Sequence, residues 1–246
     1  MNEVIKQLID RKSVRSFTDQ VIDEAIVEDI LMAAIHAPTA GNQQLYSIIR
    51  IKDQAIKEAL VETCDHQPFI AKAPLVLLFC ADCLKWYRAY EAEGCKPRRP
   101  GVGDLMIAVD DALIAAQNAV TAAWSYGIGS CYIGDIMENA ERQKEILKLP
   151  EYVFPAALVV FGYPTLHQQK RIKPARSPIE TIVFDNYYPD LSDEDIKNTL
   201  SCKTNGQDYH QWIQAFYKRK YDSDFSKEMT RSVSIFLDDY VNECND

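Results

Sequence analysis

Residues 104–126 read DLMIAVDDALIAAQNAVTAAWSY, and this stretch decides how the rest of the chain can fold. Apolar side chains occupy every turn and alanine recurs throughout, so a helix formed here has only a narrow polar stripe. Such a helix is central in a protein, because it must pack closely on several sides to be covered. We expect the other elements to gather around it, and a subunit interface is one of the surfaces that it could cover.

Composition and charge restrict the class of protein. The chain has 246 residues, of which 47% are hydrophobic and 26% charged, and it carries a net charge of −9. These values are typical of a globular protein that can bury one sizeable core. An acidic chain is a poor partner for a nucleic-acid backbone, so we expect none. A basic cluster within it indicates a small anionic ligand instead.

The lack of a recognisable targeting segment and the odd number of cysteines predict a reducing, cytoplasmic location. We expect no membrane partner. We find no signal-like leader after Met1 and no run of about 18 apolar residues that would span a membrane. Seven cysteines are an odd number and suit reduced thiols. Cys80 and Cys83 have the spacing of a redox or metal pair, but a single pair without a neighbouring histidine favours chance placement at the end of a strand.

Hydrophobic periodicity predicts the elements around the central helix. Expected helices cover residues 3–10, 24–36, 55–64, 104–126 and 138–147, and expected strands cover 46–51, 74–80 and 154–162. A charged, aromatic tail adds helical stretches at 193–200, 209–221 and 226–242, whose apolar stripes must dock on the core or on a partner. We therefore expect a domain over residues 1–189 and a helical extension over residues 190–246.

The segment Arg11-Lys12-Ser13-Val14-Arg15 combines three cations and a hydroxyl in five residues. Guanidinium groups pair with phosphate oxygens two at a time, and lysine and serine add further donors. The alternative is a solvated helix end, because cations favour the carboxyl terminus of a helix. The sequence around this segment has to decide between the two.

Two later segments suit a flat polar ligand. Residues 37–44 form an uncharged loop rich in side-chain amides, which could pair with a heterocycle or could simply join a helix to a strand. Residues 127–135 carry three glycines, but the spacing G-x-G-x-x-x-x-G after a helix excludes a dinucleotide-binding fingerprint. We expect these glycines to let main-chain N–H groups approach a flat ligand.

Basic residues recur in two further places. Residues 96–101 are basic and proline-rich, which predicts an exposed loop or lid. A second cluster is formed by Lys170, Arg171, Lys173 and Arg176.

In their order along the chain, four motifs resemble those of the FMN-dependent nitroreductase family. They are R-K-S-V-R at 11–15, A-P-T-A-G-N-Q-Q at 37–44, G-I-G-S-C-Y-I-G-D-I at 127–136 and F-G-Y-P at 161–164 with basic residues beyond it. The resemblance covers residues 3–188, and Q-L-Y-S-I-I-R at 44–50 is most similar to the NADPH-preferring, oxygen-insensitive branch. It implies an α+β sandwich with a central, mostly antiparallel sheet flanked by helices, assembled as an intertwined homodimer.

The resemblance also implies an FMN site lined by both subunits. Arg11, Lys12 and Ser13 would hold the phosphate with Lys173 and Arg176, and Arg15 would reach the pyrimidine end of the ring. The remaining implied ligands are Pro38, Thr39 and Ala40 from the partner chain, Asn42 and Gln44 at ring or ribityl groups, and Tyr132, Ile133, Gly134 and Asp135 along the other side. One extra residue separates Lys173 from Arg176 relative to the family pattern, so any of Lys170, Arg171, Lys173 and Arg176 could meet the phosphate.

The implied activity is NAD(P)H oxidoreduction through bound FMN. NADPH or NADH would give hydride to flavin N5, and a nitroaromatic compound or a quinone would then take it in a ping-pong cycle. A cation at the pyrimidine end favours this uptake, and we name no catalytic side chain and no metal. The alternatives are a flavin-binding redox sensor or storage module without catalysis, and a reductive dehalogenase on the same fold.

Overall fold

The computed structural model describes residues 1–241, whose contacts group the chain into two compact units. The first unit contains residues 1–170 and the chain from Glu228 onward, and the second contains Arg171–Lys227. These contacts divide the chain after residue 170 and before residue 228. The domain boundary that we expect between residues 189 and 190 stays a prediction.

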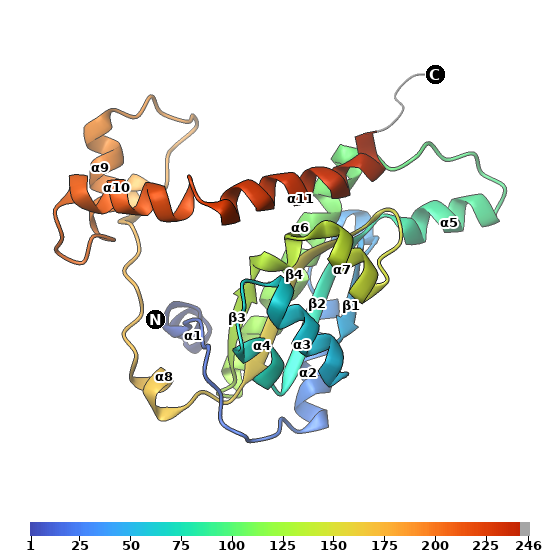
Figure 1. Cartoon of the computed structure of the whole chain (residues 1–246), viewed down its shortest axis with the longest axis horizontal. Coiled ribbons are helices and arrows are strands. Elements are labelled where there is room, and N and C mark those ends of the chain that lie inside the picture. The colour runs from blue at the N-terminus through green and yellow to red at the C-terminus, as the bar shows by residue number, and fades with distance from the viewer. Residues whose placement is uncertain (242–246) are drawn as a thin grey trace. The chain divides into compact units, whose positions relative to one another are not determined.

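The core of the first unit is an antiparallel sheet (Figure 1). Among the described residues it has four strands in the order β1-β2-β4-β3, namely β1 (Tyr46–Arg50), β2 (Leu75–Asp82), β4 (Val153–Gly162) and β3 (Gly129–Ile133). Each neighbouring pair is antiparallel. Every residue of β2 and β4 is buried, which explains why their sequences, apart from Asp82 at the end of β2, are apolar rather than alternating. The α+β fold with an antiparallel sheet is confirmed.

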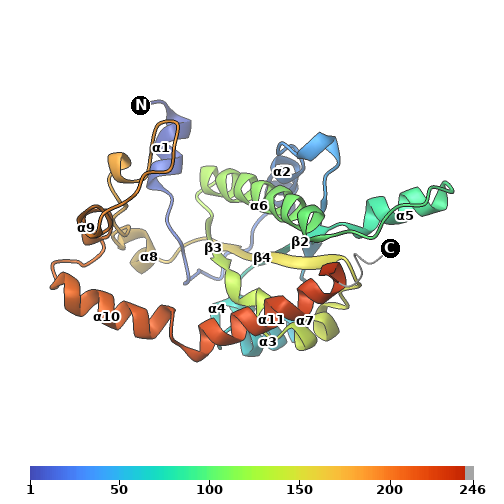
Figure 2. The same ribbon diagram turned by 90° about the horizontal axis from the view of Figure 1, so that it is seen from above.

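Helices cover both faces of this sheet (Figure 2). One face carries α2 (Glu24–Ile35) and α6 (Val102–Ser125), and the other carries α3 (Gln54–Thr63), α4 (Phe69–Lys72) and α7 (Ala140–Leu147). The face of α6 toward the sheet is a stripe of fully buried alanines at positions 108, 112, 115, 116, 119 and 123. Because these side chains are small, the helix can approach the sheet closely. The central helix that we predicted over residues 104–126 is confirmed as α6.

By length and composition, α6 could cross a membrane, contrary to our expectation that no segment is apolar enough. Part of its apolar character is accounted for by its packing on β2 and β4 and against α2. A core helix of a globular protein passes the same test of hydropathy as a membrane span.

The remaining elements correct several expectations. Residues 129–133, for which we predicted no secondary structure, form strand β3, followed by the 3₁₀ turn η2 (Gly134–Met137). The sequence also did not indicate α4 or α5 (Leu84–Ala92). The other elements are α1 (Glu3–Asp10), η1 (Ala40–Asn42), α8 (Leu166–Lys170), η3 (Ile179–Thr181), α9 (Asp193–Ser201), α10 (Tyr209–Lys220) and α11 (Asp224–Val241). The predicted helix end at Asn242 lies outside the described residues.

From Glu228 onward, α11 docks on the first unit. Ser232 Oγ donates a hydrogen bond to the Met137 carbonyl oxygen at 2.6 Å and accepts one from the Ala140 N–H at 2.8 Å. Phe236 is fully buried and meets Phe154 edge-to-face, with 5.2 Å between ring centroids. This part of the predicted tail therefore packs on the core of its own chain.

Glu138 lies buried beside the residues on which α11 docks. Its environment indicates that it makes the free energy of unfolding depend on pH in an unusual direction. Burial, followed by the charges of Asp135, Asp65 and Glu228, raises the pKa of Glu138 to about 7 from 4.5. Between these two values the unfolded chain loses a proton that the folded chain keeps. The contribution of Glu138 to the free energy of unfolding therefore falls as pH rises through this window.

We expect Glu138→Gln to flatten this part of the stability profile, measured by urea unfolding between pH 4.5 and pH 7. Exposed Glu151 provides the matched control, and Glu151→Gln should keep the wild-type slope. Equal slopes in both variants would contradict the assignment to Glu138.

Candidate functional site

The basic segment Arg11–Arg15 leaves the end of α1 and runs beside strand β3. The Arg11 N–H caps α1 by donating to the Gln7 carbonyl at 3.0 Å, so the segment is a helix end as well as a cluster of cations. Ser13 bridges to Ser130, and the Val14 N–H donates to the Ser130 carbonyl at 2.9 Å. Two motifs far apart in sequence are thereby brought together.

Gly129 makes this close approach possible. A Cβ atom at position 129 would lie 2.7 Å from the Cβ of Val14, which is itself buried. The absence of a side chain at Gly129 thus seats the basic segment on β3. The expectation that the glycines of residues 127–135 let main-chain N–H groups approach a flat ligand stays a prediction.

The positive charge of the segment reaches the middle of β3. Burial raises the pKa of the Cys131 thiol, and the charge and hydrogen bond of Arg15, followed by the charge of Arg11, oppose the rise. Burial likewise raises the pKa of Tyr132 to about 12, again opposed by Arg11. Both guanidinium groups therefore lie near the β3 residues that precede the predicted ligands Ile133 to Asp135.

Helix α8 holds the other side of the basic segment. The Lys12 Nζ donates to the Gln169 carbonyl at 2.7 Å, and the Arg15 N–H donates to Gln168 Oε1 at 3.2 Å. Gln168 is buried, while the side chain of Arg15 belongs to an exposed residue. The segment is thus fixed by the Lys12 side chain and the Arg15 main chain, and Arg15 remains an exposed residue.

The loop of residues 38–45 is tied to α6 through one carboxylate. The buried side chain of Asp111 accepts hydrogen bonds from the Thr39 hydroxyl, from the Ala40 N–H at 2.9 Å and from the Leu45 N–H at 3.1 Å. The Gln44 N–H also donates to Thr39 Oγ1 at 2.8 Å. The loop is therefore an ordered structure and not only a passive helix-to-strand connection.

Within this loop, Pro38, Asn42 and Gln44 are exposed. Asn42 and Gln44 adopt left-handed backbone angles, with φ of 57° and 51°. The Gln44 side-chain amide donates to the Ile35 carbonyl at 3.1 Å, so its N–H is already used within the chain. The Asn42 side chain lies at the surface, where it can meet a ligand.

The residues that follow Cys131 differ in accessibility. Tyr132 is half-buried, and its hydroxyl lies 3.5 Å from Gln117 Oε1. Ile133 is buried, Gly134 is exposed and Asp135 is half-buried. Gly134 therefore offers the accessible main chain of this set.

A cavity of about 510 Å³ borders the 38–45 loop. Its walls include Gln43, Trp86, Tyr90 and Arg98, the last from the basic segment that we expected to be a loop or lid. The indole N–H of Trp86 donates to the Gln43 carbonyl at 2.8 Å, which ties α5 to the loop.

Cys80 and Cys83 are buried, and burial raises the pKa of each thiol to about 12. Both are therefore protonated at neutral pH, which favours a structural role for the pair over redox or metal chemistry.

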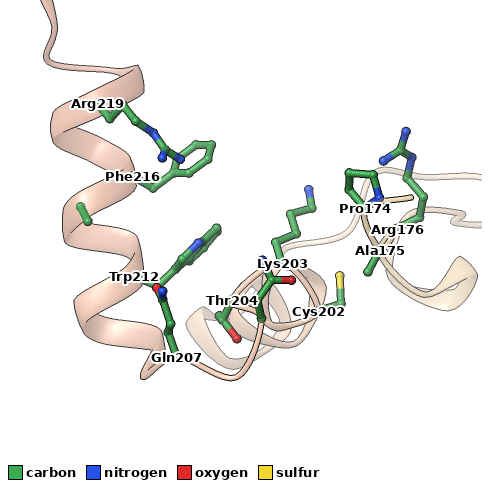
Figure 3. Close-up of a pocket in the computed structure, with 12 residues that line it drawn as sticks. Pro174, Ala175, Arg176, Cys202, Lys203, Thr204, Gln207, Trp212, Phe216 and Arg219 are labelled. Atoms are coloured by element: carbon green, nitrogen blue, oxygen red, sulfur yellow. The ribbon is translucent and has the colours of Figure 1, made fainter. Parts of the chain in front are cut away.

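The second unit contains a separate basic cavity of about 510 Å³ (Figure 3). Trp212, Phe216 and Arg219 project from α10 toward Lys203 and the segment that carries Arg176. The Arg219 guanidinium lies 5.4 Å from the centre of the Phe216 ring, and the Trp212 and Phe216 rings are 5.2 Å apart. None of the described residues that line the cavity is acidic.

Of the second basic cluster, Lys170 ends α8 in the first unit, and Arg171, Lys173 and Arg176 belong to the second. Their predicted role at a phosphate stays a prediction.

Sequence reasoning missed Asp111 and Gln168 as residues that order the site. A signal for Asp111 was present, because an aspartate between Ala108 and Ala115 falls on the buried stripe of the helix. Gln168 had no such signal, since its partner, the Arg15 N–H, lies in a distant part of the chain.

Comparisons with known proteins agree with this arrangement. A model of the family described as the nitroreductase family matches residues 8–163. An FMN reductase [NAD(P)H] of Bacillus subtilis is 32% identical over 235 residues, covering 90% of this chain and 93% of the relative. An oxygen-insensitive NADPH nitroreductase of Salmonella typhimurium is 36% identical over 195 residues, covering 79% and 78%. The structure of an NADPH:FMN oxidoreductase from Vibrio harveyi complexed with NAD+ has a TM-score of 0.81 at 26% identity, covering 96% and 98%.

Replacing Gly129 tests how the basic segment is seated. We expect Gly129→Ala to lower the free energy of unfolding by about 1–3 kcal/mol, because the new methyl group overlaps the Val14 side chain. The measurement is urea denaturation. The double variant Gly129→Ala with Val14→Ala should be less destabilised than the sum of the two single variants. Additive losses would show that the two residues do not compete for space.

Proposed function

The chain belongs to the nitroreductase family, and on that premise we propose that it is an FMN-dependent NAD(P)H oxidoreductase. The observation that carries the proposal is the position of the basic segment Arg11–Arg15 along β3, next to Tyr132 and the residues that follow it. The names of relatives, an FMN reductase and an NADPH nitroreductase, agree with it.

The residues of the first unit fit a phosphorylated flavin chemically. Arg11 and Arg15 bring two guanidinium groups to the same stretch of β3, and both oppose the effect of burial on Cys131. Ser13 and the exposed Gly134 add a hydroxyl and accessible main chain. This set is rich in donors, which a phosphate and the oxygen atoms of a flavin ring require.

In the proposed site, Arg11, Lys12 and Ser13 hold the phosphate, and Arg15 lies at the pyrimidine end of the ring. Pro38, Thr39 and Ala40 come from the partner subunit's loop, Asn42 and Gln44 meet ring or ribityl groups, and residues 132–135 line the opposite side. Lys173 and Arg176 remain candidates for the phosphate on the sequence alone.

FMN, when bound, supplies a ring that accepts hydride at N5 from NAD(P)H and returns it to an acceptor such as a nitroaromatic compound or a quinone. Donor and acceptor then use one face in turn, which is a ping-pong cycle. The task of this chain is to orient the ring and to place the charge of Arg15 where negative charge develops. Solvent supplies the protons.

We also propose that the basic cavity of the second unit can bind an adenine nucleotide such as NADP+. Trp212 and Phe216 offer aromatic faces for a purine, and Lys203 and Arg219 offer charge for phosphate groups. The extra phosphate of NADPH would gain more from these cations than NADH does.

Exposed apolar surface supports a homodimer. In α1, Val4, Ile5, Leu8 and Ile9 are all at least 45% exposed, although together they form the apolar face of the helix. In α6, Met106, Ile107, Leu113 and Ile114 are exposed on the side away from the sheet. Surface of this kind is typical of a protein interface. We place the dimer in the cytoplasm, in agreement with the free thiols of the described residues.

The activity is tested by purification and anaerobic titration. We expect bound FMN whose absorbance bleaches on adding NADPH or NADH and returns on adding a quinone. Arg15→Ala should keep FMN bound while lowering its reduction potential, because a cation near the ring is lost. An unchanged potential would show that Arg15 does not face the ring.

A protein that cannot be reconstituted with FMN would overturn the proposal. Normal FMN binding with hydride transfer too slow for turnover would favour the sensor or storage alternative, and turnover of a halogenated aromatic would favour the dehalogenase.

The cavity of the second unit is tested by Arg219→Ala. Loss of one charged contact to phosphate should raise the dissociation constant for NADP+ by about tenfold, and that for NAD+ by less, as measured by isothermal titration calorimetry. Exposed Lys218 on the same helix does not line the cavity, and Lys218→Ala should leave both values unchanged. Equal effects of the two variants would contradict this assignment.

A further inference from the structure

We infer that Asp111 is a positioning residue that holds the 38–45 loop in the conformation that binds cofactor. The inference rests on the proposed function, in which this loop contacts FMN. It adds a residue that touches no proposed ligand atom and acts only through the loop.

The geometry joins both ends of the loop to one side chain. Asp111 Oδ2 accepts from the Thr39 hydroxyl and from the Leu45 N–H, and Oδ1 accepts from the Ala40 N–H. Because residues 39 and 40 open the loop and residue 45 closes it, the carboxylate fixes the distance between its ends. A loop fixed at both ends loses most of its conformational freedom before a ligand arrives.

The position of Asp111 in α6 makes this anchor rigid. The residue is 3% exposed and lies on the helix face that carries Ala108, Ala112 and Ala115, each of them fully buried. A carboxylate in such a place is costly unless its oxygens receive hydrogen bonds. The loop supplies these bonds, so the burial of Asp111 and the conformation of the loop depend on each other.

The backbone between the two ends is strained. Gly41, Asn42 and Gln44 all have φ between 51° and 57°, in the left-handed region. For residues other than glycine this conformation is unfavourable and persists only where surrounding contacts enforce it. The result of that enforcement is an exposed Asn42 beside an accessible main chain, as a site for a heterocycle requires.

Helix α5 braces the middle of the same loop. The Trp86 indole N–H donates to the Gln43 carbonyl, and the Lys85 Nζ donates to the Tyr46 carbonyl at 2.6 Å. The Leu45 carbonyl also accepts from the Asp82 N–H at 2.9 Å, and Asp111 is the acceptor for the N–H groups of Ala40 and Leu45. Loss of Asp111 should therefore release residues 39–45 locally without unfolding α6, whose packing is apolar.

The test compares Asp111→Asn with Asp110→Asn. Both variants remove one negative charge from α6, but Asp110 is exposed and Asp111 is buried. The asparagine amide at 111 keeps one acceptor and presents an N–H donor to a group that itself donates. Three readouts are taken on the full chain: amide hydrogen exchange of residues 38–46 in the FMN-free protein, FMN dissociation constant by fluorescence titration, and urea unfolding.

We expect Asp111→Asn to speed exchange at Ala40 and Leu45 at least tenfold and to weaken FMN binding at least tenfold, with Asp110→Asn equal to wild type in both. A variant that is less stable in urea but matches Asp110→Asn in exchange and in FMN affinity would overturn the inference, because Asp111 would then be only structural.

A second variant covers the case in which Asp111→Asn fails to fold. Thr39→Val removes one donor to Asp111 and the acceptor of the Gln44 N–H, and it should speed exchange at Gln44 and Leu45 in the FMN-free protein. Unchanged exchange would overturn the inference. Failure of wild-type protein to bind FMN would instead overturn the proposed function, and the exchange data would still decide whether Asp111 positions the loop.

Discussion

Close packing of α6 on the sheet is the contact on which the rest of the first unit depends. Alanines at the interface let the helix lie directly on β2 and β4, and both strands can then be apolar except at Asp82, the last residue of β2. The same helix carries Asp111, so the element that completes the core also fixes the 38–45 loop. Stability and site geometry are therefore linked through one helix.

Charge is distributed unevenly around that core. An acidic chain concentrates Arg11, Lys12 and Arg15 in one segment and seats this segment on β3 through Val14 and Gly129. The segment is held in place by hydrogen bonds of the Val14 N–H to Ser130 and of the Arg15 N–H to Gln168 in α8. Its position therefore does not depend on ion pairs between its guanidinium groups and carboxylates. Such a fixed positive region is what an anionic cofactor can use.

Sequence patterns predicted the helices and buried strands well where the periodicity was long and pure, as in residues 104–126 and 154–162. They did not predict β3, because three glycines in nine residues obscure the strand, and Gly129 is needed to admit Val14 from a distant part of the chain. They also did not predict α5, in which no residue is buried.

By itself the sequence determined the central helix, the basic segment and the order of motifs that resemble one family, because these are properties of neighbours along the chain. Only the tertiary structure decided that Arg11 and Arg15 lie near Cys131, that Asp111 closes the 38–45 loop and that part of α11 returns to the core. The physical reason is that each of these contacts joins residues that only chain folding brings within hydrogen-bonding or electrostatic range.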